Sequence, residues 1–387
     1  MNFVMRQHCC NHKLTMKRRN FVALEGTTIV ATSGIYYLSC NTGLFKRADT
    51  RNEVHQNIPV ENADEREILF LASRAPSGHN TQPWFVIYVK PYHWIIGNDK
   101  SKWLPTVDPT QRETVMSIGA FLQNLEYAAQ NAGYVCQFTL LATCNQDEKM
   151  MEVHLKKSSD FVTYDIQKIK QRRTLRSNYL NSTLKEEDLI FLTENETDFI
   201  HYIPNTSIVN QWLNEQTIVA NNLQINRQDA QEELSEWIRF SSKKAQSRAD
   251  GLSVASMEID GITAWYLRNF YEKSDVMKAG FKEKSINRVR EQVAHSAGWL
   301  LITSKDDTVK SLLDTGKRLQ RLLLKIKDRN IAIHPMTQIM EEPSTRQLLK
   351  TSIVLNDHIQ LVLRIGYVAK YPQPVSLRRP LEWFVRT

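Results

Sequence analysis

The most chemically suggestive stretch of the chain is a polar loop. Residues 74–84 read RAPSGHNTQPW and separate the apolar, helix-like EREILFLAS from the strand-like WFVIYV. Proline, glycine, serine and asparagine all favour turns, so one interpretation is a simple connection. The other is a loop whose small residues let backbone N–H groups and short side chains approach a flat polar ligand.

A cluster of arginines stands a hundred residues further on. Arg172, Arg173, Thr174 and Arg176 place three cations and a hydroxyl within five residues. The planar guanidinium binds phosphate through two hydrogen bonds, and threonine adds a donor. Because lysines precede the cluster, a solvated basic helix end is the alternative.

A second arginine pair, Arg378 and Arg379, lies in SLRRP near the end of the sequence. It could complete an anion site, and an ordinary basic tail is the alternative.

Composition excludes several classes of function. The formal net charge of +8 is modest for 387 residues, and no basic run with interleaved aromatics predicts binding to nucleic acid. Five cysteines without a CxxC pattern predict neither a disulfide framework nor a zinc site. The ten histidines are scattered without HExxH, so the pattern predicts no metal centre.

The first 40 residues are predicted to be a leader or an anchor. KRRNFV, from residue 17, resembles a twin-arginine export signal, and Met16 would be its natural start. The apolar stretch 21–38 is about long enough to span a membrane, so a retained anchor is the alternative. Cys40 is a further candidate for lipidation. The expected location is exported, periplasmic or membrane-associated, and residues 41–60 are expected to be a linker.

Two stretches of the chain align without gaps. IGAFLQNLEYAAQNAGYV (118–135) matches TGKRLQRLLLKIKDRNIA (315–332), so that Gly119 falls on Gly316 and Gln123 on Gln320. Gly133 falls on Asn330, and both residue types tolerate the left-handed position that ends a helix. The match predicts two related halves, 61–160 and 161–387, that pack as an internal pseudo-dimer.

The fold class predicted from these patterns is α+β, with largely antiparallel sheets and buried central helices. Strand-like runs and helices do not alternate strictly, and the stretch 111–132 is apolar nearly all round in MSIGAFL. Only the first half carries the polar loop, and only the second carries the arginine cluster. A single composite site between the halves is therefore expected.

Residues 61–145, 165–180 and 290–385 together resemble the FMN-dependent nitroreductase superfamily, within it the Acg-like branch of single-chain pseudo-dimers. The resemblance rests on APSGHNTQPW, RRTLR, the DPTQRE stretch from residue 108, HPMTQIMEEPSTR from residue 334, and LRIGY with the closing RRPL. Leu175 stands where that branch usually has asparagine. Residues 241–285 do not match the family pattern residue by residue and are expected to form a helical lid or a dimer-wrapping insertion.

The resemblance implies a nitroreductase-like fold and non-covalently bound FMN at the junction of the halves. Its phosphate and ribityl end would contact the RRTLR motif, with Arg378 or Arg379 closing the site. Residues 76–80 would line the flavin ring, and Gln82 would either contact the ring or cap the following strand. His79 either donates a proton or bonds only locally, and no catalytic residue is assigned. The residues expected to bind FMN are Pro76, Ser77, Gly78, His79, Asn80, Gln82, Arg172, Arg173, Thr174, Arg176, Arg378 and Arg379.

Three functions remain open at this point. The first is an FMN-dependent oxidoreductase that passes electrons from NAD(P)H or another donor to nitroaromatic, quinone or similar small-molecule acceptors. The second is a protein that stores FMN without turnover, and the third is a membrane-tethered binding module without flavin. No GxGxxG follows a strand, so a nicotinamide would have to use the flavin's open face. The twin-arginine export machinery is the expected macromolecular partner.

Overall fold

The computed structural model describes residues 60–159 and 163–387. The predicted leader and nearly all of the predicted linker lie outside these residues. Within the described ranges, no helix combines the length and apolar character needed to cross a bilayer.

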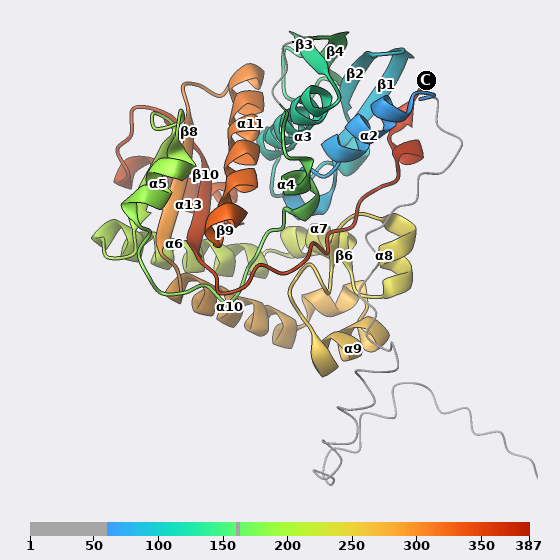
Figure 1. Ribbon diagram of the computed structural model, residues 1–387. Helices are drawn as coiled ribbons and strands as arrows, with labels where there is room; N and C mark the ends of the chain where they lie inside the picture. Colours follow the sequence, from blue (N-terminus) through green and yellow to red (C-terminus); the bar gives the residue numbers. More distant parts are fainter. Residues whose placement is uncertain (1–59, 160–162) are drawn as a thin grey trace, which may run out of the picture. The chain divides into compact units, whose positions relative to one another are not determined.

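The first part of the described chain is built around one sheet and one long helix (Figure 1). The helix α3 (Arg112–Asn131) is buried along most of its length and packs against α2 (Ala63–Ala72). The sheet has the strand order β11-β1-β2-β4-β3. Its strands are β1 (Trp84–Lys90), β2 (His93–Asn98), β3 (Tyr134–Leu140), β4 (Lys149–Lys157) and β11 (Val385–Arg386).

The second part repeats this arrangement. Its sheet has the order β5-β8-β10-β9, which matches β1-β2-β4-β3 strand for strand, and all neighbours in both four-stranded sets are antiparallel. The elements are α5 (Glu186–Thr193), β5 (Ile200–Pro204), β8 (Gly298–Ser304), α11 (Val309–Lys325), β9 (Ile331–Pro335) and β10 (His358–Tyr367). The predicted α+β class with antiparallel sheets and buried central helices is confirmed.

The two aligned stretches of sequence lie on α3 and α11, which pack together. A Cβ added to Gly119 would lie 2.1 Å from the carbonyl oxygen of Leu313, and one added to Gly316 would lie 1.9 Å from that of Met116. Each contacted residue stands three positions before the partner helix's glycine, so the contact is reciprocal. The left-handed residues Gly133 (φ 82°) and Asn330 (φ 51°) follow the two helices, as predicted.

Polar side chains along the same interface are reciprocal as well. Gln320 donates from Nε2 to Oδ1 of Asn124 at 2.7 Å, and Arg321 donates from Nη1 to Oε1 of Gln123 at 2.7 Å. In the sequence alignment Gln123 falls on Gln320, and Asn124 falls on Arg321. These contacts and the matching sheet topologies support the internal pseudo-dimer hypothesis.

A long helical segment interrupts the second part between β5 and β8. It comprises α6 (Ile208–Asn226), α7 (Gln228–Trp237), α8 (Ser242–Arg248), α9 (Gly261–Phe270) and α10 (Ala279–Ala294), with the short strands β6 (Ile238–Arg239) and β7 (Leu252–Ser253). In the first part, β1 and β2 are joined by a tight hairpin. The inserted segment is therefore wider than the predicted 241–285.

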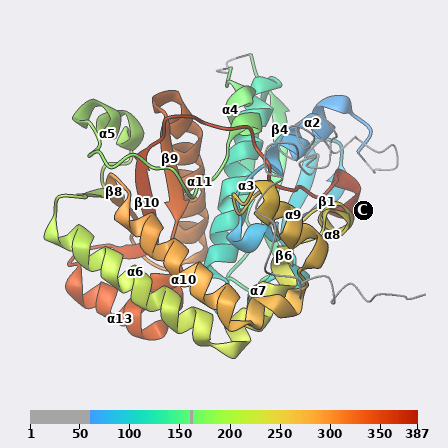
Figure 2. The same cartoon turned by 90° about the horizontal axis from the view of Figure 1, so that it is seen from below.

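The insertion explains why the two sheets differ in burial. Leu300 and Ile302 of β8 belong to the core shared with α3 and α11, whereas Trp299 and Leu301 on the other face pack with α6, α10, α12 (Gln338–Glu341) and α13 (Pro343–Ser352). Figure 2 shows α6, α10 and α13 on this other side of the second sheet. On the first sheet, core-facing side chains alternate with half-buried ones, as in β4.

The last segment of the chain crosses from the second sheet to the first (Figures 1 and 2). After β10 it runs past α4 (Ile166–Gln171) and ends in β11, which pairs in parallel with β1 through Val385 and Val86. It therefore links the two parts of the fold.

The glycine contacts predict that Gly119→Ala and Gly316→Ala each destabilise the protein. An added methyl group has to push apart two helix backbones, and overpacking of this kind typically costs about 1–3 kcal/mol. Urea unfolding of the full chain measures the change. Gly280→Ala is the matched control, because nothing lies within 4 Å of its Cβ; there alanine is expected to stabilise by up to about 1 kcal/mol. Equal midpoints for all three variants would contradict the close approach.

Candidate cofactor-binding cavity

A cavity of about 580 Å³ lies where the polar loop, α3, α11 and the inserted helices meet. Such a volume is typical of sites for cofactors and other small molecules. The loop, the arginine cluster and the last segment of the chain all reach it. The predicted residues in its lining are Pro76, Ser77, Gly78, His79, Asn80, Arg172, Thr174, Arg176 and Arg378.

The polar loop has the small-residue wall that the sequence predicts. It follows α2 and forms a short 3₁₀ turn, Gly78–Asn80, in which His79 and Asn80 have positive φ. A Cβ added to Gly78 would lie 3.2 Å from Cδ1 of Leu104 and 3.6 Å from Oε2 of Glu113. Glycine therefore keeps the space between this wall and α3 open.

Asn80 holds the loop in place. Its Nδ2 donates to the carbonyl oxygens of Gly251 and Leu377, both at 3.1 Å, and its Oδ1 accepts from Nη1 of Arg378 at 2.7 Å. Asn80 thus ties the first sheet's loop to the inserted segment and to the last segment of the chain. Its amide is engaged in these bonds, which explains its place in the motif without any ligand.

Arg378 clamps the same loop from the other side. Besides Asn80, it donates from Nη2 to the carbonyl oxygens of Arg74 and Ala75, both at 3.0 Å. Burial lowers the pKa of Arg378 well below its usual range, and the positive charges of Arg172 and Arg74 lower it further. The alternative of a solvated basic tail is wrong for Arg378 and Arg379, which are both buried.

Three predicted residues lie outside the lining and support it instead. Gln82 donates to the carbonyl of Ala249 and accepts from the backbone N–H of Arg379, both at 2.9 Å, so it neither lines the cavity nor caps the strand. Arg379 donates to the carbonyls of Gln82 and Trp84. Arg173 donates to the carbonyl of Gln373 at 2.7 Å and lies 3.8 Å from the Glu258 carboxylate.

The RRTLR motif follows α4. The alternative interpretation, in which it is a solvated basic helix end, is also wrong. Arg172 is only 8% exposed, lines the cavity, and its Nε has no hydrogen-bond partner among the described residues. Its Nη1 donates to Thr174 at 3.4 Å. Burial and, to a smaller degree, the charge of Arg176 lower the pKa of Arg172 to about 10. A buried cation with so little compensation favours a bound anion.

Arg176 is held against the inserted segment. Its backbone N–H donates to Oε1 of Glu258 at 2.9 Å, and its Nη1 donates to the carbonyl of Ser256 at 2.7 Å. Burial lowers its pKa, Glu258 opposes that shift, and the positive charge of Arg288 adds to it. The basic end of the cavity thus contains Arg172, Arg176, Arg378 and also Arg288 and Lys284 from α10.

Arg288 and Lys284 were missed from the sequence because they lie in the inserted segment, outside the motifs that carry the resemblance. The sequence signal for them is the basic helix FKEKSINRVR, which becomes α10. Another buried arginine, Arg364 of LRIGY, donates to the carbonyl of Arg176 at 2.6 Å and positions the motif.

The cavity lining also contains two carboxyl groups, Glu113 from α3 and Glu341 from α12. Burial raises the pKa of Glu113 well above its usual range, and the negative charge of Glu341 raises it further. Burial also raises the pKa of Glu341, although hydrogen bonds from Thr337 and Gln224 oppose the shift. Both residues lie in motifs quoted from the sequence, but neither was expected to line the cavity.

His79 is an uncharged group in the cavity wall. Burial and the nearby charge of Arg176 lower its pKa to about 4, and its Nδ1 has no hydrogen-bond partner among the described residues. At neutral pH it is therefore a neutral imidazole rather than an imidazolium ready to give up a proton. Of the two predicted roles for His79, proton donation is disfavoured by this lowered pKa.

Comparisons with known proteins find distant relatives that are named as nitroreductases. The chain is 22% identical over 311 residues to a protein named probable NAD(P)H nitroreductase PigM, from a Serratia species, which covers 76% of this chain and 86% of that protein. It is 24% identical over 318 residues to the putative NAD(P)H nitroreductase acg of Mycobacterium tuberculosis, covering 81% and 92% of the two chains. No family model matches the chain.

Among solved structures, the FMN-dependent nitroreductase NfnB from Mycobacterium smegmatis in complex with NADPH is similar to this chain. The similarity has a TM-score of 0.34 and 15% sequence identity, and covers 54% of this chain and 92% of that one.

The raised pKa of Glu113 predicts a pH-dependent effect of Glu113→Gln. Between the usual glutamate pKa and the raised value, the unfolded chain is ionised and the folded chain is protonated, so stability falls as the pH rises. Glu113→Gln lacks the ionisable group, so its free energy of unfolding does not fall in this way. Relative to the wild type, that free energy should rise by about 1.4 kcal/mol per pH unit in this window, and the two proteins should be equally stable near pH 4. Urea midpoints at several pH values measure it. Glu187→Gln, an exposed change on α5, is the matched control.

Proposed function

We propose that this protein is an FMN-binding oxidoreductase of the nitroreductase type, in the Acg-like branch of that superfamily. The observation that carries the proposal is a single cavity that joins the small-residue loop to a group of buried arginines. Among them is Arg172, whose buried Nε has no hydrogen-bond partner in the part of the chain that the structure describes. The named relatives support the same class.

The residues present fit FMN. Arg172, Arg176 and Arg288 would hold its phosphate, and Thr174 would add a hydroxyl donor. The loop residues 76–79, with Leu104 and Met116, offer a wall of small and apolar groups for a flat ring. Bound FMN would supply the electron-transfer chemistry, and the protein would set its orientation and potential.

Glu113 is a carboxyl group of the lining suited to hold a proton beside the ring wall. Its Oε2 lies 3.6 Å from the Cβ position of Gly78, and its raised pKa keeps the carboxyl protonated at pH values where most glutamates are ionised. Reduction of a nitro group or a quinone consumes protons as well as electrons. A protonated carboxyl in the cavity wall meets that need.

NAD(P)H is the proposed electron donor, because the relatives carry that name. With no separate nucleotide-binding motif in the sequence, donor and acceptor would use the same cavity in turn. The proposed acceptors are nitroaromatics, quinones or similar small molecules. Export by the twin-arginine route, and a periplasmic or membrane-associated location, stay predictions from residues outside the described ranges.

Storage of FMN without turnover is the second candidate, and one observation favours it. Residues of the inserted segment line the cavity, among them Met257, Ile259, Leu267, Tyr271 and Phe281. An apolar wall of this kind would shield a bound flavin and narrow the access of a second substrate. Turnover distinguishes the two candidates.

The visible absorption spectrum of the purified full chain tests the proposal. We expect a flavin spectrum, directly or after FMN is added, that bleaches when NADPH is supplied without oxygen and recovers when a quinone follows. A spectrum that forms but never bleaches would favour storage. A protein that takes up no FMN would refute both candidates.

Replacing Arg172 with glutamine tests the phosphate end. Hydrogen bonds to charged groups are worth about 1.5–3 kcal/mol, so the dissociation constant for FMN should rise about 10- to 150-fold. The ligand-free protein should be no less stable, because a buried charge near Arg176 and Arg378 is removed. Arg290→Gln, exposed on the same helix as Arg288, is the matched control and should bind FMN like the wild type. Unchanged affinity in Arg172→Gln would contradict the assignment.

A further inference from the structure

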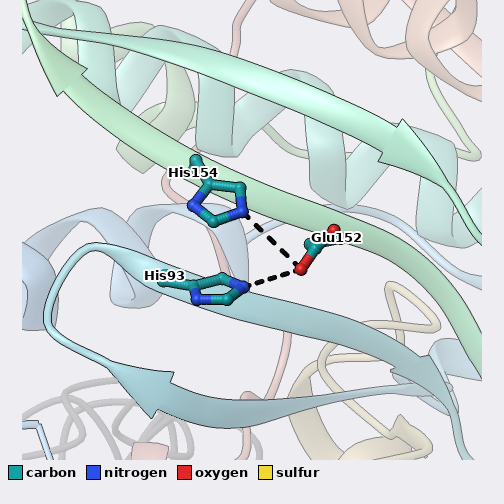
Figure 3. Close-up of side chains that lie close together, drawn as sticks. All are labelled: His93, Glu152 and His154. Atoms are coloured by element: carbon teal, nitrogen blue, oxygen red, sulfur yellow. Dashed lines mark hydrogen bonds and ion pairs between the residues drawn. The ribbon is translucent and has the colours of Figure 1, made fainter.

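Three side chains that do not line the cavity lie together on the outer face of the first sheet (Figure 3). His93 is on β2, and Glu152 and His154 are on β4. The strands are antiparallel neighbours in which His93 stands directly opposite His154. Because Glu152 precedes His154 by two residues, all three side chains project from the same face.

This face is the one turned away from the core. The alternate residues Trp94 and Val153 are fully buried in the core that α3 shares, whereas His93, Glu152 and His154 are half-buried. The side chains of Glu152 and His154 are 29% and 39% exposed, so an ion can reach them from solvent. None of the three lines the cavity.

The geometry is close to that of a three-ligand metal centre. Nε2 of His93 lies 2.8 Å from Oε1 of Glu152, and Nε2 of His154 lies 3.6 Å from the same oxygen. One ligand atom from each side chain lies within 4.8 Å of the others. In a tetrahedral zinc site with bonds of about 2.0–2.2 Å, ligand atoms are about 3.2–3.6 Å apart. Small side-chain rotations would therefore suffice.

The two imidazoles are already arranged side by side. Their ring centroids are 3.8 Å apart, with an angle of 23° between the rings. Two imidazole nitrogens and one carboxylate oxygen suit zinc, copper, nickel or cobalt better than magnesium or calcium. Rigid neighbouring strands hold the donors, which lowers the entropy lost when an ion is bound.

We propose that His93, Glu152 and His154 form a binding site for a divalent transition-metal ion of the zinc class. The three residues supply three ligands, and water takes the open position. The bound ion would tie β2 to β4, a contact made on the exposed face of the sheet and independent of the flavin chemistry in the cavity.

Zinc binding by the untagged full chain, first stripped with a chelator, tests the proposal. We expect one zinc ion per chain in competition with a chromophoric chelator. At a hundredfold excess of free zinc over the dissociation constant, the melting temperature should rise by about 3–5 °C. With copper(II) in place of zinc, electron paramagnetic resonance should show coupling to two imidazole nitrogens.

Variants decide whether the ion sits at these residues. Glu152→Gln and His154→Gln should each weaken zinc binding at least tenfold and, at the same zinc concentration, reduce the thermal shift to about half or less, with unchanged circular dichroism. His358→Gln is the matched control: His358 lies on β10, the counterpart of β4, and its Nδ1 is 2.9 Å from Asp307. It should bind zinc like the wild type.

Two results would overturn the proposal. One is the lack of stoichiometric zinc uptake by the wild type at micromolar concentration, which would leave the cluster as a hydrogen-bonded ion pair only. The other is uptake that persists in Glu152→Gln and His154→Gln, which would place the ion elsewhere. Neither result would bear on FMN binding.

Discussion

Two helix backbones can touch only where no side chain stands between them, and the rest of this structure depends on one such contact. Gly119 and Gly316 let α3 and α11 approach until each glycine meets a carbonyl of the other helix. Each helix also carries its own sheet, so this crossing fixes how the two sheets face each other. Met116 and Leu319, on either side of the crossing, form part of the cavity wall.

Buried polar groups give the contact its specificity. The Gln123–Arg321 and Asn124–Gln320 bonds are satisfied in only one alignment of the helices, because a shift along the axis would leave several polar groups buried and unpaired. Arg378, Asn80 and Gln82 act similarly between the loop and the last segment of the chain. The cavity is thus shaped by long-range hydrogen bonds, while its apolar walls supply most of its surface.

The sequence allowed the loop, the arginine motifs and strand β1 to be predicted, because each is written in a short run of residues. Other features depend on residues far apart in the chain. Gln82 and Arg379 were expected at the ligand and instead bond to each other, 297 positions apart. Arg288 lies in the inserted segment, outside every motif that carries the resemblance, and the His93–His154 pairing depends on the register of two strands. No local pattern encodes such placements.

The route of the last segment has a consequence for the order of assembly. Asn80 and Arg378, which bond across the cavity wall, are 298 positions apart, and a chain emerges from the ribosome from its N-terminus onward. The polar loop is synthesised early, and Arg378, which holds it, is added only when nearly all of the remaining chain has been made. Until then the cavity lacks one wall, so a ligand that needs the complete cavity would be bound late. Retention of such a ligand would therefore indicate that the last segment of the chain has been synthesised and has folded into place.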